Sequence, residues 1–373
     1  MKAVTVKEFH IPFYAKISIF FVGLFVFITI LYLCRSIIIP LVFALIIAIV
    51  LHPVVNFFVR RKLHRILAIV LTLLLTFVVV AGFGVLLYSQ ASRFSESWPT
   101  LVEKFTLMLN ESITWASGYF NVDATRIREW IAKSKGELIN ISSASIGQTL
   151  VSIGGWLMVM FLVPVYTFLI LYYHSLLLYF IHRIFSAHNQ QKVSEIIKQI
   201  KTVIQRYLIG LLIEFVIVAS LNSIGLLILG IDYAILLGII GGLLNLIPYI
   251  GGLIAVSLPM MVAIVTKDNA WYAVYVLAIH YFIQLFDNNF IVPKIVASKV
   301  KINALFAIIA IIAGNALWGV PGMFLSVPLL AIVKLIFDHI EPLKPWGFLL
   351  GDTMPTLLKI KLKPIRLKRT NKI

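Results

Sequence analysis

The stretch Asn245-Leu-Ile-Pro-Tyr-Ile-Gly-Gly252 interrupts an uncharged segment that runs from residue 233 to 266. A second uncharged segment, residues 302–333, is interrupted in the same way by Gly314-Asn-Ala-Leu-Trp-Gly-Val-Pro-Gly322. Such interruptions expose backbone polar groups, which a bilayer tolerates only where they are buried in protein or line a cavity. Paired interrupted segments are typical of the binding site of a membrane transporter.

The composition places the chain in a membrane. Of its 373 residues, 61% are hydrophobic and 13% are charged, whereas a soluble domain is about 25% charged. Several windows exceed the roughly 18 uncharged residues that mark a spanning helix. The sequence therefore predicts an all-α, polytopic membrane protein whose first partner is the lipid bilayer.

The basic residues are distributed as expected for the cytoplasmic loops of a membrane protein. The net charge is +17, and seven of the 32 basic residues fall between Lys359 and Lys372. Other basic runs at 60–65, 183–206 and 294–301 flank apolar segments, which is the positive-inside pattern. This distribution argues against a nucleic-acid partner. We expect these loops and both termini on the cytoplasmic side.

The arms of the interrupted segments are short. Without their tips they hold 12 to 15 residues each, and at ~1.5 Å per residue a helix of that length reaches only about 18 to 22 Å. The hydrocarbon core of a bilayer is about 30 Å thick. We therefore expect two re-entrant hairpins, over residues 233–266 and 302–337.

The predicted architecture has about six full spans plus the two re-entrant helical hairpins. Arg206 and Lys294 are both expected on the cytoplasmic side, so the chain must cross the membrane an even number of times between them. The spans 207–229 and 271–291 supply two crossings and the first hairpin none, so the two span-plus-hairpin units have opposite orientation, which is an inverted arrangement. Five regions are expected: an N-terminal three-helix membrane region (1–91), an extramembrane amphipathic helical region (92–148), a fourth span and cytoplasmic amphipathic helix (149–206), a transport core (207–340) and a basic cytoplasmic tail (341–373).

Residues 92–148 differ from their surroundings. They hold six basic and six acidic residues, with three interleaved tryptophans. Two interpretations are open: short amphipathic helices at the membrane surface, or a small helical cap packed on the spans.

The tip of the first hairpin carries five candidate binding residues: Asn245, Pro248, Tyr249, Gly251 and Gly252. Proline removes a backbone donor, and glycine permits close approach. The tip can thus offer unpaired carbonyls and amides to a substrate or cation, between two half-helix ends. The alternative is a plain helix-turn-helix at the far membrane face.

A polar stripe lies inside the predicted span 271–291. Its residues recur at helical spacing, and two further ones follow: His280, Gln284, Asp287 and Asn288, then Asn289 and Pro293. The carboxylate of Asp287 can release a proton or bind a cation, so it is the expected coupling group. The alternative is that Asp287 marks the cytoplasmic interface, seven residues before Lys294.

Glu214 is a second carboxylate, more than one turn inside the predicted span Tyr207–Leu229. An intramembrane carboxylate is by default a candidate functional group, and we expect it to support Asp287. The alternative is an ion pair with Arg206 near the membrane surface.

The second hairpin offers one polar side chain, Asn315, as a candidate binding residue. Four residues that break or bend helices are expected to shape it: Gly319, Pro321, Gly322 and Pro328. Elsewhere, Gly238, Gly241 and Gly242 predict close helix packing.

Nothing in the sequence supports an enzyme. It has no Gly-x-x-x-x-Gly-Lys-[Ser/Thr] phosphate loop, no metal-binding spacing of His, Cys and Glu, and no Gly-x-Ser-x-Gly motif. We expect no cofactor and no metal site, only coupling to H⁺ or Na⁺. An intramembrane hydrolase ranks last among the alternatives.

Three motifs in a fixed order carry a family resemblance: Pro248-Tyr-Ile-Gly-Gly252, Asp287-Asn-Asn-Phe-Ile-Val-Pro293, and Gly314 to Pro328 with Trp318-Gly-Val-Pro-Gly322 inside it. Over nearly its whole length the chain resembles the autoinducer-2 exporter family of bacterial membrane transporters. The resemblance implies an inner-membrane protein that exports a small quorum-sensing signal or exchanges sodium and protons. It also implies a homo-oligomer, with a ring of five as the expected form. Gly252 stands where many members have proline, which leaves the tip looser.

The sequence thus predicts a secondary transporter that exports a small, autoinducer-like polar solute coupled to ion entry through Asp287. A sodium/proton antiporter on the same scaffold is the first alternative, and ion flux without organic cargo would identify it. The second is a non-transporting envelope protein that recruits partners through residues 92–148 or the tail. In that case, deletion of residues 359–373 would abolish function.

Overall fold

The computed structural model describes residues 12–120, 160–186, 189–247, 251–267, 269–296 and 302–352, and the regular structure within these ranges is helical. Five of the described helices are long and apolar enough to cross a membrane, or six if the pair Met160–Tyr172 and His174–Ile184, bent by 67°, forms one span. The prediction of an all-α polytopic membrane protein is therefore confirmed. The labelled helices are α1 (Phe13–Leu33), α2 (Arg35–Arg60), α3 (Arg65–Phe120), α5 (His174–Ile184), α6 (Gln190–Ile228), α7 (Ala234–Asn245), α8 (Gly251–Thr266), α9 (Trp271–Phe286), α10 (Ala304–Trp318), α11 (Val320–His339) and α12 (Lys344–Leu350).

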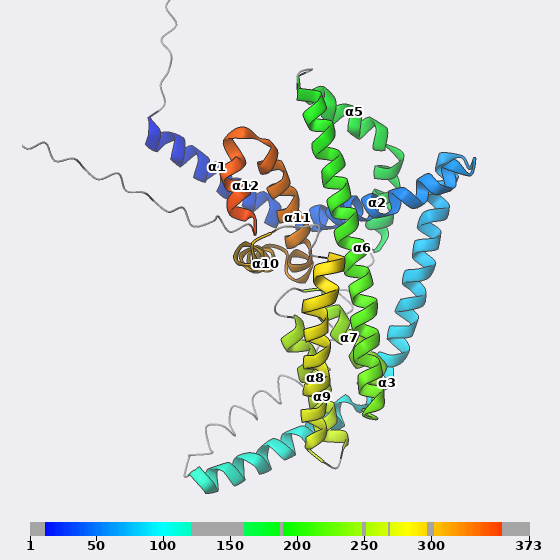
Figure 1. The fold of residues 1–373 in the computed structure, drawn as a ribbon, viewed down its shortest axis with the longest axis vertical. Coiled ribbons are helices and arrows are strands. Elements are labelled where there is room, and N and C mark those ends of the chain that lie inside the picture. Colours follow the sequence, from blue (N-terminus) through cyan, green and yellow to red (C-terminus); the bar gives the residue numbers. More distant parts are fainter. Residues whose placement is uncertain are drawn as a thin grey trace, which may run out of the picture.

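The helices run in two main directions (Figure 1). α6, α8 and α9 follow the long axis of the molecule, whereas α1 and α2 lie across it. α6 contacts α2, α7, α9 and α11, so it connects the two groups. It is the central scaffold of the described chain.

Two helices continue through positions where the sequence predicts boundaries between regions. α3 has 56 residues and passes from the expected third span, which ends at Tyr88, into the region from residue 92, with Pro99 in its interior. Figure 1 shows that α3 changes direction along its length. α6 has 39 residues and joins the predicted amphipathic helix to the span from Tyr207. Neither boundary carries a glycine or proline that would end a helix.

The first hairpin begins at a glycine turn after α6. Gly230 has a φ of 64°. The amides of Gly230 and Ile231 donate to the carbonyls of Leu227 and Leu226, both at 2.9 Å. This is the Schellman pattern, in which glycine adopts the left-handed backbone that ends a helix. α7 then packs back along α6.

Small residues bring α7 close to α6. A Cβ on Gly238 would meet the backbone nitrogen of Ser223 at 2.5 Å, and one on Gly242 would meet that of Ala219 at 3.0 Å. Gly238 and Gly242 are four residues apart on α7, and Ala219 and Ser223 are four residues apart on α6. This spacing of small residues is the small-xxx-small pattern of membrane helix packing. We call this contact the glycine seam. It seats the first arm of the hairpin on α6 through the backbone.

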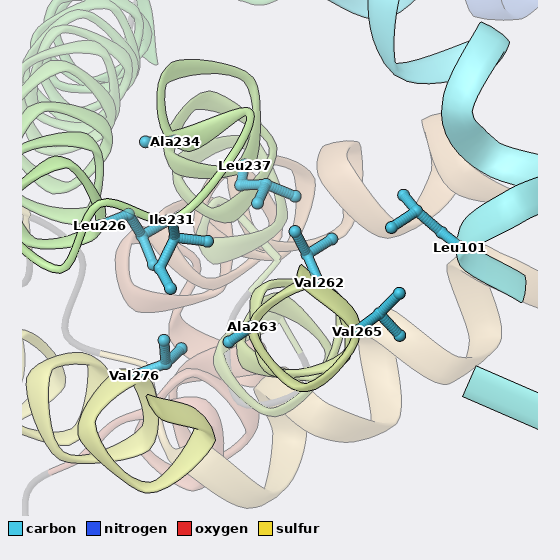
Figure 2. Packing of buried hydrophobic residues seen from close by; sticks show 9 residues of the cluster. All are labelled: Leu101, Leu226, Ile231, Ala234, Leu237, Val262, Ala263, Val265 and Val276. Carbon is cyan, nitrogen blue, oxygen red and sulfur yellow. The ribbon is translucent and has the colours of Figure 1, made fainter. Parts of the chain in front are cut away.

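An apolar cluster, here called the base cluster, packs around the end of the hairpin away from its tip. Its buried residues are Leu101, Leu226, Ile231, Ala234, Leu237, Val262, Ala263, Val265 and Val276. Figure 2 shows Leu101 of α3 pointing towards Val262 and Val265 of α8. Nearby, Tyr233 donates from its hydroxyl to Ser97 Oγ at 2.6 Å. This part of the polar region therefore packs on the hairpin. Residues 121–148 lie outside the described ranges.

The second hairpin differs from the predicted one. α10 runs to Trp318, so the interruption is the single residue Gly319, with a φ of 65°, and not the whole stretch from Gly314. α11 has 20 residues, which at ~1.5 Å per residue is about 30 Å, the thickness of the hydrocarbon core. α11 is therefore long enough to cross the core, unlike the short arm expected for a re-entrant hairpin.

Both interruptions pack on one apolar core, here called the tip cluster. Its buried residues are Ile46 of α2, Ile204, Tyr207, Leu208 and Leu211 of α6, Ile311 of α10, and Leu325 and Val327 of α11. Leu246 and Ile247, which follow α7, pack against it, and so do Trp318 and Met323 of the second hairpin. The two interrupted segments therefore meet the same part of the scaffold.

Candidate functional site

Two acidic side chains from different helices share one amide at the tip of the first hairpin. Asn245, the last residue of α7, donates from Nδ2 to Asp287 Oδ2 at 2.8 Å and to Glu214 Oε1 at 3.2 Å. Asp287 is 1% exposed and Glu214 is 5% exposed. We call these three residues the carboxylate cluster.

The carboxylate cluster has no counter-charge among the described residues. Oδ1 of Asp287 is buried there without a hydrogen-bond partner. The ion pairs of the described chain are Lys334–Asp338 and Lys344–Glu341, so Glu214 does not pair with Arg206. A buried charge without a partner costs several kcal/mol. The free oxygen therefore calls for a proton or a cation.

The polar stripe of α9 extends the cluster. Gln284 donates from Nε2 to Asn245 Oδ1 at 3.4 Å. One turn earlier, the ring of His280 lies 2.9 Å from the Gly252 carbonyl oxygen through Nε2 and 3.2 Å from Asn222 Oδ1 through Nδ1. The spacing in the sequence thus placed His280, Gln284 and Asp287 on one face, and the structure turns that face towards the hairpin tip.

Glycine at the start of α8 permits this approach. A Cβ on Gly251 would overlap the backbone carbonyl of Leu244, and one on Gly252 would lie 3.0 Å from Gln284 Oε1. Larger residues at these positions would separate α8 from α7 and α9. The other two candidates at the tip, Pro248 and Tyr249, lie outside the described residues.

The helix changes pitch at Asp287. α9 ends at Phe286, and a π-helix follows over Asp287–Val296 with Pro293 inside it. The wider turn rotates later side chains away from the 3.6-residue period. Asn288 and Asn289 are exposed, and Asn289 Nδ2 donates to Leu285 O of its own helix at 2.8 Å. The structure does not bring these two residues or Pro293 to the carboxylate cluster.

The candidate residues of the second hairpin also lie elsewhere. Asn315 is exposed on α10. A Cβ on Gly322 would overlap the Gly314 carbonyl, so α10 and α11 touch through their backbones. The residues expected to shape this hairpin occupy the turn and α11: Gly319, Pro321, Gly322 and Pro328.

Asn222 belongs beside the site although it was not among the predicted site residues. Its Nδ2 donates to Val218 O at 2.9 Å, which leaves Oδ1 free to face His280. It lies eight residues after Glu214 on α6, hence near the same helical face. That spacing is the signal by which the sequence indicates it.

The described site consists mainly of oxygen atoms. Two carboxylates, the amide oxygens of Asn245 and Gln284, and the Gly252 carbonyl lie around the tip of the first hairpin. Such oxygen groups bind protons and hard cations.

Comparisons with known proteins place the chain in a family. It matches the model of the AI-2E family transporters over residues 19–341. It is 28% identical over 158 residues to "Putative transport protein YueF" of Bacillus subtilis, 42% of each chain. It is 25% identical over 250 residues to "Putative permease PerM" of Escherichia coli, 66% of each chain. These alignments span less than two thirds of either relative. Because the family model covers most of its length, the chain belongs to the AI-2E family of transporters.

Proposed function

We propose that the protein is a secondary transporter of the bacterial inner membrane that couples the export of a small polar solute to an ion gradient through its carboxylate cluster. One observation carries the proposal. Oδ1 of Asp287 is buried without a partner, beside a second buried carboxylate. A charged pair of this kind is costly to bury and, inside a membrane, marks an ion or proton pathway.

In this mechanism the first hairpin, whose arms α7 and α8 hold 12 and 16 residues, is re-entrant. The glycine seam and the base cluster join α6, α7, α8 and α9 into one block. Alternating access moves this block against α2, α10 and α11, which meet it at the tip cluster. Ion binding at Asp287 neutralises the cluster and so removes the cost of its uncompensated buried charge.

A sodium/proton antiporter is the second candidate. The oxygen-rich character of the carboxylate cluster favours it, because the groups described there bind a cation without needing an organic cargo. Ion exchange without solute movement would distinguish it from solute export.

Flux in proteoliposomes tests the coupling role. We expect Asp287→Asn to abolish ion-coupled flux under imposed sodium and proton gradients, because the isosteric amide keeps the hydrogen bond but cannot carry a charge. Asp232→Asn removes the same charge from an exposed position and should retain wild-type flux. Full coupled flux in Asp287→Asn would refute the assignment.

A further inference from the structure

A second polar site lies apart from the carboxylate cluster. A cavity of about 260 Å³ opens between α2, the start of α3 and the start of α5. Its polar lining residues are His52, Asn56, Arg65 and His174. Its volume exceeds the ~30 Å³ share of a single water several-fold, so it has room for a polyatomic group.

The cavity carries positive charge. Lys201 of α6 reaches it, with Nζ 3.0 Å from His52 Nδ1. The charged or titratable groups that act on His52 are Lys201, His174 and Arg65, and no carboxylate of the described chain is among them. The ion pairs formed by the described residues lie at 334–338 and 341–344, away from this cavity. Its charge is therefore not neutralised by the described protein.

The cavity also has more donors than acceptors. Arg65 donates from Nη2 to Leu171 O at 2.8 Å and from Nη1 to Ser175 Oγ at 3.4 Å, which leaves part of its five-donor fork unused. The Lys201 ammonium uses one of three donors on His52 Nδ1. Since that nitrogen accepts, the neutral His52 ring carries its hydrogen on Nε2 and is a further donor.

The fold holds these groups in place. The 67° bend after Tyr172 frees carbonyls at the end of the preceding helix, and Arg65 binds one of them. The rings of His52 and His174 lie 4.7 Å apart between centroids. The donors thus come from four segments and converge without depending on one flexible side chain.

We propose that this cavity binds a phosphate group. A guanidinium fork and an ammonium are the usual ligands of phosphate oxygens. The basic turn at 60–65 adjoins the cavity, and basic pockets between membrane helices on the cytoplasmic side receive lipid headgroups. The phosphate belongs either to an anionic phospholipid of that leaflet or to a free phosphate ion, and both present the same oxygens.

The full-length protein in detergent provides the test. Native mass spectrometry would measure binding of phosphatidylglycerol against phosphatidylcholine with equal acyl chains. Calorimetry would measure binding of inorganic phosphate against chloride at constant ionic strength. The variant Arg65→Gln/Lys201→Gln should bind at least about tenfold more weakly, because it loses charge-assisted hydrogen bonds. The control Arg183→Gln/Lys198→Gln removes equal charge from exposed residues outside the cavity lining and should bind as wild type.

Each outcome of these binding measurements either supports the phosphate proposal or overturns it. Selective phosphatidylglycerol binding that the cavity variant loses identifies a lipid headgroup, and phosphate binding alone with the same loss identifies a free ion. Wild-type protein that binds neither overturns the proposal, as does equal binding in the cavity and control variants. If the double variant does not fold, Lys201→Gln carries the test, since the hydrogen bond described for this lysine is to His52.

Discussion

The two hairpins share a sequence signature and pack on the same apolar tip cluster, but among the described residues only the first also meets buried carboxylates. The tip of the first places Asn245 between two buried carboxylates. The tip of the second turns at Gly319, and its Trp318 packs on the apolar tip cluster and donates from Nε1 to Leu31 O at 3.0 Å. Glycine and proline thus indicate where an apolar segment breaks. The neighbouring helices decide whether the break forms a polar site or a packing contact.

The largest effect is expected in the second hairpin. Gly322→Val should destabilise the protein by about 3 kcal/mol, the upper part of the range for overpacking, because its side chain meets the Gly314 backbone, which cannot move aside. Thermal unfolding in detergent measures this, with Gly23→Val on the open face of α1 as the control. An unchanged unfolding midpoint would contradict the backbone contact.

Asn245→Ala should act on transport. The substitution removes the donor shared by Asp287 and Glu214, and a hydrogen bond to a charged group contributes about 1.5–3 kcal/mol. We therefore expect coupled flux to fall about ten- to a hundredfold while the protein stays folded. Retention of wild-type flux would show that the first hairpin packs as the second does.

Glu214→Gln should have a smaller effect. The glutamine can still accept from Asn245, and Asp287 remains charged, so we expect about a tenfold weaker apparent affinity for the coupling cation, or about 1.4 kcal/mol. Flux measured against sodium concentration and against pH tests this. Loss as complete as in Asp287→Asn would make the two carboxylates equal partners.

Asn315→Ala should have the smallest effect. The side chain is exposed on α10, and surface substitutions usually change stability by less than about 0.5 kcal/mol. We expect less than a twofold change in flux, measured beside Asn245→Ala in one preparation. A loss equal to that of Asn245→Ala would place the second hairpin at the transport pathway as well.

Local periodicity predicted part of the site. Intervals of three and four residues put His280, Gln284 and Asp287 on one face, and they share that face in the structure. The same rule added Asn288, which is exposed. The rule assumes a constant pitch, and the π-helix that begins at Asp287 changes it. The change in pitch is not visible in a hydropathy pattern.

Contacts between residues far apart in the chain could not be predicted from the sequence. Composition predicted membrane helices, but it did not show that α3 continues past Tyr88 or that Leu101 of this continuation joins the base cluster. The pairing of Asp287 with Asn245 joins residues 42 apart, and no local pattern specifies such a partner. Helical spacing also allows Glu214 to pair with Arg206, so the sequence does not distinguish that alternative from the contact with Asn245 that the structure shows.

The glycine seam limits which motions the molecule can make. Interfaces built from long side chains can slide, since rotamers adjust as helices shift. Gly238 and Gly242 instead rest on the main chain of Ser223 and Ala219, where no rotamer can absorb a displacement. A gate formed by the first hairpin alone would have to break this contact at every turnover. The first arm of the hairpin is therefore expected to move together with α6, and any sliding contact is expected where this pair meets α2, α10 and α11.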